Sequence, residues 1–273
     1  MAAPPFIQFQ NVTKSYGKHL VLNDITVDIP FKEITGIIGS SGSGKTTLLN
    51  LLIGFIRTNS GKILFQSREL KKDIKNISTI FGFATQAGSF YGNLTIQENF
   101  YYFGSLYDLH KKDIEGRMNE LLNLLELDYA KNVLAKDLST GMQRRLDISL
   151  ALIHNPKVLI MDEPTEDLDP ILRKELVKII RKIRDDGTTI IITSHLLNEI
   201  ENLCDNIAIL SDGRIIEFDS PTKLKDKYKK QSLDEVFEVV VQKFHKEEGI
   251  DPKKHDMPTY QIPFWWEKEE KKK

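Results

Sequence analysis

Gly39-Ser40-Ser41-Gly42-Ser43-Gly44-Lys45-Thr46 is the stretch that decides the fold of this 273-residue chain. It fits the pattern of Gly, any four residues, Gly, Lys and then Ser or Thr. Residues 34–38 form an apolar run typical of a short buried strand, and residues 47–53 have the composition of an apolar helix. A flexible Ser/Gly linker would not lie between such elements, so we interpret the stretch as a phosphate-binding loop.

The loop has the chemistry of an anion site. Glycines let successive backbone N–H groups turn toward one centre and approach an anion closely. A helix that begins at Lys45 points its positive end at the same place, and the Lys45 ammonium adds a full charge. The Thr46 hydroxyl can reach Mg²⁺. We expect phosphates to be bound by Gly39, Ser40, Ser41, Gly42, Ser43, Gly44, Lys45, Thr46 and Thr47.

A second motif carries two carboxylates. Residues 158–161 are apolar and are followed by Asp162 and Glu163. A strand end delivers side chains to the edge of the sheet where the phosphate loop also lies. Asp162 suits the coordination shell of Mg²⁺, and Glu163 suits a general base that deprotonates water for attack on the γ-phosphate.

Strands and helices alternate along much of the chain. Helices are predicted at residues 170–185 and 196–203 from apolar residues at helical spacing. The alternation favours a mainly parallel sheet in an α/β fold. Strands are predicted from the short apolar runs at residues 7–10, 20–29, 79–84, 158–161, 189–193 and 206–210.

The pattern changes between residues 88 and 153, where no strand-like run occurs. It favours an all-helical lobe inserted into the α/β core. Two further helices are predicted at residues 221–230 and 232–245, and the charged residues 246–273 are expected to form a disordered tail. The apolar residues at helical spacing in the lobe include Leu106, Ile114, Met118, Leu121, Leu122, Leu124 and Leu125.

Composition narrows the classes of function. Lys and Arg number 38 against 39 Asp and Glu, which argues against a general nucleic-acid binder. The single cysteine, Cys204, excludes an intramolecular disulfide and a multi-cysteine metal site, and its apolar surroundings predict a buried, inert thiol. The sequence shows no membrane-spanning run and no signal peptide, so we expect a cytosolic protein that reaches a membrane through a partner.

In kind and in order, these motifs resemble those of the nucleotide-binding subunit of an ABC transporter, over residues 7–220. The resemblance implies a P-loop NTPase core with a mainly parallel sheet, an N-terminal antiparallel β-subdomain and an inserted α-helical lobe. It places one ATPase domain at residues 5–245, with the lobe at about 88–153. It also implies that the cofactors are ATP and Mg²⁺, and that ATP is hydrolysed to ADP and phosphate to drive transport.

Further roles follow from the resemblance alone. Tyr16 resembles the aromatic residue that stacks on adenine, although it could be an ordinary loop aromatic. Gln86 resembles the glutamine that reaches Mg²⁺ and the attacking water. His195 resembles the histidine that contacts the γ-phosphate, with a helix-capping or core histidine as the alternative.

Residues 138–142 resemble the family's signature motif, and residues 167–169 resemble its D-loop. Ser139 and Gly141 begin a helix, so their N–H groups form a second anion site. The family uses it in a head-to-tail dimer, where one chain's signature closes over ATP held by the other. Two residues depart from the family pattern: Thr140 replaces a usual Gly, and Glu166 stands where small residues are common.

The partners implied are a second nucleotide-binding subunit, identical or related, and a separate membrane permease. Aromatic residues around Gln86 either form a groove for a helix of that permease or belong to the core of the lobe, with Phe90 and Tyr91 the best candidates for exposure. Residues 232–237 resemble the C-terminal end of ABC-2-type exporter ATPases, which favours export. Residues 258–266 either dock on a partner or at a lipid interface, or are disordered.

Two other functions stay open from the sequence. One is a soluble ABC-type ATPase without a permease, such as a cofactor-assembly ATPase. The other is a binding or regulatory module without turnover, against which the intact pair of Asp162 and Glu163 argues.

Overall fold

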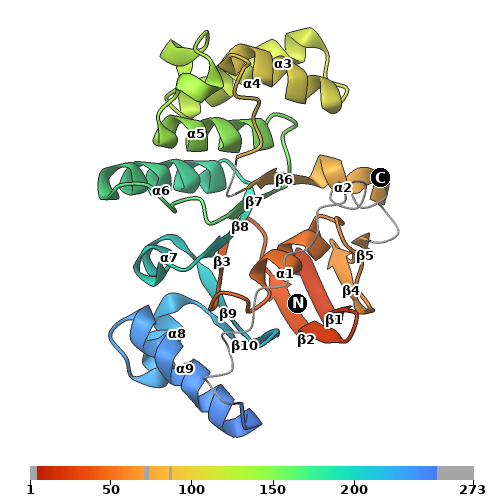
Figure 1. Ribbon diagram of the computed structural model, residues 1–273, viewed down its shortest axis with the longest axis vertical. Helices are drawn as coiled ribbons and strands as arrows, with labels where there is room; N and C mark the ends of the chain where they lie inside the picture. Colours follow the sequence, from red (N-terminus) through yellow and green to blue (C-terminus); the bar gives the residue numbers. More distant parts are fainter. Residues whose placement is uncertain (1–4, 71–73, 86–87, 251–273) are drawn as a thin grey trace, which may run out of the picture.

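Two sheets and a helical lobe make up this computed structural model, which describes residues 5–70, 74–85 and 88–250 (Figure 1). The smaller sheet is antiparallel and confirms the N-terminal β-subdomain. Its strand order is β2 (His19–Ile29), β1 (Ile7–Tyr16), β4 (Ser60–Phe65) and β5 (Arg68–Glu69).

The larger sheet is parallel except at one edge, as expected for the α/β class. Only β10 runs antiparallel to its neighbour β9. Its strand order is β10 (Arg214–Asp219), β9 (Asn206–Ser211), β3 (Ile34–Ile38), β8 (Thr189–Ser194), β7 (Val158–Asp162) and β6 (Phe81–Ala84).

The helices of the described residues connect these strands and build the lobe. The helix predicted at residues 170–185 has those bounds in the structure, since Asp169 caps its start and Pro170 occupies its first turn. The helices are α1 (Lys45–Leu52), α2 (Ile74–Ile80), α3 (Ile96–Leu106), α4 (Lys111–Leu124), α5 (Thr140–Ala151), α6 (Pro170–Asp185), α7 (Leu197–Leu203), α8 (Pro221–Tyr228) and α9 (Leu233–Glu248).

Some predicted bounds are wrong. Residues 79 and 80 end α2 instead of beginning β6, because the helix leads straight into the strand and a short apolar run does not separate the two. The sequence patterns miss β4, β5 and β10. Every residue of β10 is only partly buried, so this edge strand lacks the apolar run that marks a central strand.

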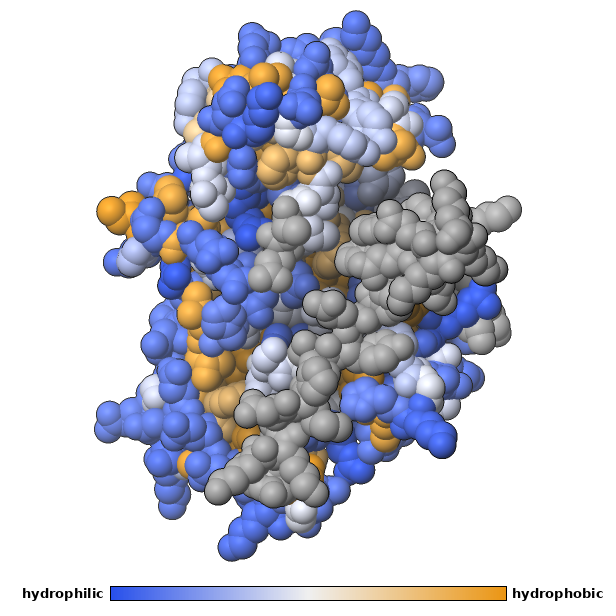
Figure 2. All heavy atoms as spheres, viewed as in Figure 1, coloured by the Kyte–Doolittle hydropathy of each residue, from blue (hydrophilic) through white to orange (hydrophobic). Residues whose placement is uncertain are grey.

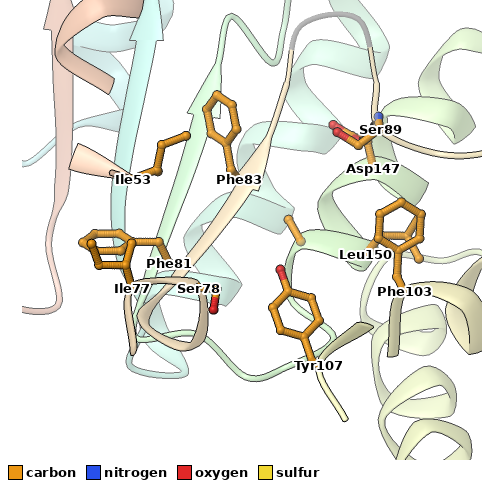
Figure 3. A pocket seen from close by; sticks show the side chains of 11 residues that line it. Ile53, Ile77, Ser78, Phe81, Phe83, Ser89, Phe103, Tyr107, Asp147 and Leu150 are labelled. Carbon is orange, nitrogen blue, oxygen red and sulfur yellow. Dashed lines mark hydrogen bonds between the residues drawn. The ribbon is translucent and has the colours of Figure 1, made fainter. Parts of the chain in front are cut away.

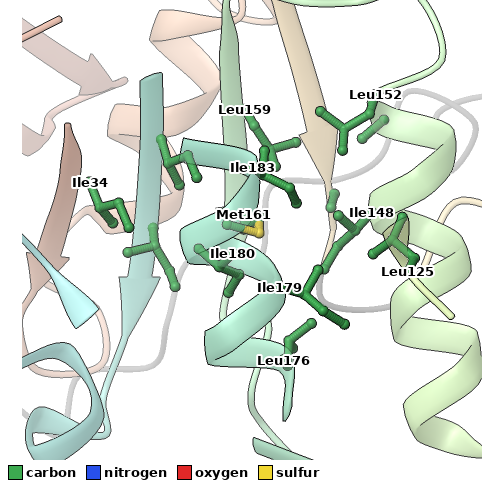
Figure 4. Close-up of a cluster of buried hydrophobic side chains, with 14 of the residues drawn as sticks. Ile34, Leu125, Ile148, Leu152, Leu159, Met161, Leu176, Ile179, Ile180 and Ile183 are labelled. Carbon is green, nitrogen blue, oxygen red and sulfur yellow. The ribbon is translucent and has the colours of Figure 1, made fainter. Parts of the chain in front are cut away.

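The pleat of the larger sheet sends alternate side chains into two hydrophobic cores. Along β7, Leu159 and Met161 pack with α5 and α6, while Val158 and Ile160 pack with α1 and the antiparallel sheet. Figure 4 shows the first of these cores, with the isoleucines of α6 beside Leu159 and Met161. Burial on both faces fixes the central strands, and therefore the positions of the residues that follow them.

The helical lobe contains α3, α4 and α5, and its described residues 88–153 contain no strand longer than an isolated bridge. Thr95 and Glu98 form a capping box at the start of α3. The predicted apolar face is buried at Ile114 and Met118, but Leu106 is 62% exposed at the end of α3. Leu106 is the last residue before the helix ends, where the helical spacing no longer determines burial.

The C-terminal part contains α8 and α9. Helix α9 continues three residues beyond the predicted end at residue 245 and ends at Gly249, whose φ is 65°. The proposed tail therefore begins inside a helix, and residues 251–273 lie outside the described residues. Cys204 is buried, as predicted, and burial raises the pKa of its thiol.

Hydrophilic residues predominate over the outer helices in the space-filling view, with apolar side chains visible between them (Figure 2). No helix of the described residues is both long and apolar enough to cross a membrane.

Candidate nucleotide site

The glycine-rich loop follows β3 and leads directly into α1. Gly42 and Gly44 have φ angles of 79° and 109°, a region that glycine enters without steric cost. The Lys45 ammonium donates hydrogen bonds to the carbonyl oxygens of Gly39 at 2.9 Å and Ser40 at 3.2 Å. The ammonium and the N-terminal end of α1 therefore bring positive charge to one loop.

The carboxyl ends of three neighbouring parallel strands, which we call the carboxyl edge of the sheet, bring the other candidate residues together. Ile38 of β3 pairs with Ser194 of β8, and Asp162 of β7 pairs with Thr193 of β8. The phosphate loop, Glu163 and His195 each directly follow one of these strand ends. The register of the sheet thus gathers groups that lie 150 residues apart in the chain.

Glu163 forms hydrogen bonds with Thr193 near the end of β8 and with His195 just after it. Its φ is 51°, and its backbone N–H lies 3.1 Å from both the carbonyl oxygen and the hydroxyl of Thr193. A non-glycine residue in this region costs about 1–3 kcal/mol and persists where its surroundings enforce it. The Glu163 carboxylate accepts a hydrogen bond of 2.5 Å from Nδ1 of His195.

Asp162 is better buried than Thr46, the other predicted metal ligand among the described residues. Burial raises the pKa of its carboxyl, and the hydrogen bond that the Thr193 hydroxyl donates to Oδ1 opposes that shift. Sequence reasoning missed Thr193, which supports both Asp162 and Glu163. A threonine within the apolar run at residues 189–193 is the signal that could have identified it.

Lys45 faces these two carboxylates across the site. Burial lowers the pKa of its ammonium, while the charges of Glu163 and Asp162 oppose the shift. The Lys45 ammonium can bind an anion, and the carboxylates of Asp162 and Glu163 can bind a divalent cation beside it. Partial burial strengthens both interactions.

The donor set fits a nucleotide phosphate chain with Mg²⁺. The Ser43 hydroxyl is buried without a hydrogen-bond partner among the described residues, and Thr46 is exposed at the start of α1. The described residues contain no group of three His, Cys, Asp or Glu side chains that could hold a metal ion. Magnesium needs no such group, because it usually keeps waters and substrate phosphates as ligands.

Tyr16 ends β1 and lies against α1. Its hydroxyl interacts with the side chain of Thr47, and the Lys14 ammonium lies 5.0 Å from the centre of its ring. The structure therefore places Tyr16 beside α1, the helix that follows the phosphate loop. That its ring stacks on adenine stays a prediction.

The signature residues belong to a different part of the molecule. Ser139 is the N-cap of α5 and accepts a hydrogen bond from the N–H of Met142. A Cβ at Gly141 would lie 3.0 Å from Leu172 of α6, so this first turn packs against α6. Thr140 is exposed.

Gln86 lies outside the described residues, but the segments on both sides of it are attached to α5. Arg144 donates a hydrogen bond of 2.8 Å to the carbonyl oxygen of Thr85. The N–H of Ser89 donates one of 2.6 Å to Asp147, which is buried. Burial raises the pKa of Asp147 to about 6. The helix that begins with the signature thus also fixes residues 85 and 89.

A pocket of about 170 Å³ opens beside this attachment (Figure 3). Phe81 and Phe83 of β6 lie on one side, and Phe103 and Tyr107 of the lobe lie on the other. Among the described residues that line the pocket, Asp147 is the only one with a carboxylate. The pocket is thus apolar and aromatic with one buried acid.

The aromatic residues near Gln86 divide between core and surface. Phe81 and Phe100 are buried, whereas Tyr91 is 50% exposed, as predicted, and Tyr102 is 40% exposed. Phe90, the other candidate for exposure, is only partly exposed and packs against the core. Its ring lies over Gly88, where a Cβ would come within 2.9 Å of it.

The sequence matches the protein family described as "ABC transporter" over residues 22–166. The lantibiotic transport ATP-binding protein SrtF of Streptococcus pyogenes is 36% identical over 83% of this chain and 97% of its own length. The Nod factor export ATP-binding protein I of Rhizobium johnstonii is 33% identical over 81% of this chain and 71% of its own.

The chain spans only 34% of one further relative, the ABC transporter G family member 20 of Dictyostelium discoideum. Among solved structures, cbiO1 from Clostridium perfringens, described as part of the ABC transporter complex cbiONQ, superposes with a TM-score of 0.77. It is 25% identical, and the match covers 90% of this chain and 100% of that one.

Proposed function

This chain belongs to the ABC transporter family, and we propose that it is the ATP-hydrolysing subunit of a membrane exporter. As a member of that family it is an ATPase. The export assignment is supported by relatives whose names refer to lantibiotic transport and Nod factor export. The observation that carries the proposal is the shared strand edge, where the phosphate loop, two carboxylates and His195 meet.

Each residue at that edge has one role in the proposal. The loop amides and Lys45 bind the phosphates of ATP, and Thr46 and Asp162 hold Mg²⁺, which neutralises charge on the phosphates. Glu163 accepts the proton of the attacking water, and His195 keeps its carboxylate oriented. Gln86 is proposed to reach Mg²⁺ and that water, and Tyr16 to stack on adenine.

We further propose a head-to-tail dimer with an identical or related subunit. Ser139 and Gly141 stand at the start of α5 in the helical lobe, whereas Lys45 begins α1 after β3, and in this proposal they complete the nucleotide site of a second chain. ATP bound between two chains stabilises their association by mass action, and hydrolysis removes that stabilisation.

The proposed second partner is a permease, which would hold this subunit at the inner face of the cell membrane. The pocket between β6 and the lobe supports the proposal, because its aromatic lining suits an amphipathic helix of a partner. The exposed rings of Tyr91 and Tyr102 lie on the same lobe.

The variant Glu163→Gln tests the catalytic assignment. Glutamine keeps the size of the side chain but cannot accept the proton, so turnover should fall about 10²–10⁴-fold while ATP binding is retained. Phosphate release and equilibrium binding of a fluorescent ATP analogue measure the two quantities. Turnover close to that of the wild type would show that another group is the base.

Purification from detergent-solubilised membranes tests the transport assignment. A multi-span membrane protein should co-purify with the tagged chain. Recovery of the active ATPase without any membrane protein would favour a soluble ATPase of the same family instead.

A further inference from the structure

We propose that the C-terminal helix α9 positions the phosphate loop, and that His245 is the residue through which it does so. The inference rests on the proposed function, because it takes the loop at residues 39–46 as the ATP site. His245 touches no substrate in this scheme and acts as a positioning residue.

The first step is the contact between α9 and the turn after β9. His245 is only 8% exposed, and its Nε2 lies 2.8 Å from Oδ2 of Asp212. The Ser211 hydroxyl donates to the same carboxylate oxygen at 2.8 Å and lies 3.3 Å from Nε2. Because the acceptor is a carboxylate, this hydrogen bond is stronger than one between neutral groups, so α9 fixes this turn.

The second step connects the turn to the phosphate loop. The N–H of Gly213 donates a hydrogen bond of 3.2 Å to the carbonyl oxygen of Ser43, and its carbonyl oxygen accepts one of 2.8 Å from Asn23. A Cβ at Gly39 would lie 2.3 Å from the carbonyl oxygen of Leu210, so the loop and the end of β9 are in close backbone contact. A shift of the turn must therefore move the loop.

Among the described residues, the other side chains of α9 make apolar or exposed contacts. Leu233, Val236 and Val240 anchor the helix by apolar packing. The ion pair of Arg214 with Glu248 measures 3.3 Å, but both side chains are more than 40% exposed, and such pairs contribute little. The partly buried contact of His245 with Asp212 thus links the helix to the turn.

The variant His245→Phe tests this link. It keeps an aromatic ring in the core but removes the donor to Asp212, so the loop loses a constraint. The KM for ATP should rise about fivefold with kcat at saturating ATP little changed, the pattern of lost binding. The variant His245→Gln places an amide nitrogen near the position of Nε2 and should restore KM to near the wild-type value.

The matched control is Lys243→Ala on the same helix. Lys243 lies on the exposed face and forms an ion pair of 3.9 Å with Glu247, so its loss should leave KM unchanged. Thermal unfolding of every variant identifies a general loss of stability. Unchanged KM in a folded His245→Phe variant overturns the inference. A wild-type protein that fails to bind ATP would instead refute the proposed function.

A measurement on the wild-type chain needs no variant. Coupling between two sites is reciprocal, so if α9 stabilises the ATP-binding loop, then ATP must stabilise the contact of α9. Hydrogen exchange of backbone amides at residues 241–249 should slow when ATP is added. Exchange that is identical with and without ATP, while amides of the phosphate loop are protected, overturns the inference.

Discussion

The backbone and the carboxylate of Glu163 have separate partners, Thr193 and His195, which lie two residues apart at the end of β8. A general base must be oriented before the reaction, since each reorientation would raise the barrier. Thr193 also donates to Asp162, so one threonine side chain supports the proposed base and the proposed metal ligand. The positions of both proposed groups therefore depend on Thr193, which the motifs of the sequence do not include.

Asp147 gives a prediction of pH dependence. Burial raises its pKa from the usual value of 3.8 to about 6, so the folded chain keeps a proton that the unfolded chain releases. The stability that this proton provides is complete below pH 3.8 and is lost as the pH rises through about 6. The full difference is about 3 kcal/mol.

The variant Asp147→Asn removes the charge and keeps an oxygen that accepts from the N–H of Ser89. Its free energy of unfolding in urea should exceed that of the wild type at pH 8 and equal it near pH 4. If the free energies of unfolding of variant and wild type differ by the same amount at pH 4 and pH 8, ionisation of Asp147 does not cause the difference.

At the scale of elements, α3 and α4 of the lobe offer a matched pair of glycines. A Cβ at Gly104 of α3 would lie 2.6 Å from Cγ1 of Ile114, whereas nothing lies within 4 Å of one at Gly116 of α4. Gly104→Ala should lower the free energy of unfolding by about 1–3 kcal/mol, since it overpacks the contact of the two helices.

Gly116→Ala is the control for that substitution. Alanine has the higher helix propensity, so this variant should gain about 0.5–1 kcal/mol. Thermal or urea unfolding of both variants gives the comparison. A stabilising effect at both positions would mean that the contact of α3 with α4 is looser than the structure shows.

At the scale of the whole molecule, the proposed dimer makes a prediction about mixtures. Lys45→Ala disables the phosphate loop, and Ser139→Asp keeps a good N-cap for α5 while it places a negative charge where phosphate should bind. Each variant alone should be inactive. An equal mixture should regain part of the ATPase activity, because a mixed dimer contains one site with an intact loop and an intact signature.

The measurement is phosphate release at constant total protein, compared with that of each variant alone. A mixture of Lys45→Ala with Lys45→Met is the control and should stay inactive, since no combination restores the loop. Absence of recovery, with dimers present in solution, would argue against a site shared between chains.

The sequence by itself determined the fold class and the strand-end motifs. Local spacing encodes both: a glycine-rich loop between a buried strand and a helix at residues 34–53, and a carboxylate pair after the buried strand at residues 158–161. The helix at residues 170–185 was also predictable, because Asp169, Pro170 and Gly187 mark its ends locally. The edge strand β10 carried no such local pattern, because all of its residues are only partly buried.

Only the tertiary structure decided which distant residues meet. The register of β3, β7 and β8 set the loop, Glu163 and His195 at one edge, and the docking of α9 brought His245 to the turn that contacts Ser43. These contacts join residues up to about 170 positions apart, and the packing of both faces of the sheet fixes them. Spacing along a chain records the period of one element, whereas contact between elements depends on how all of them pack.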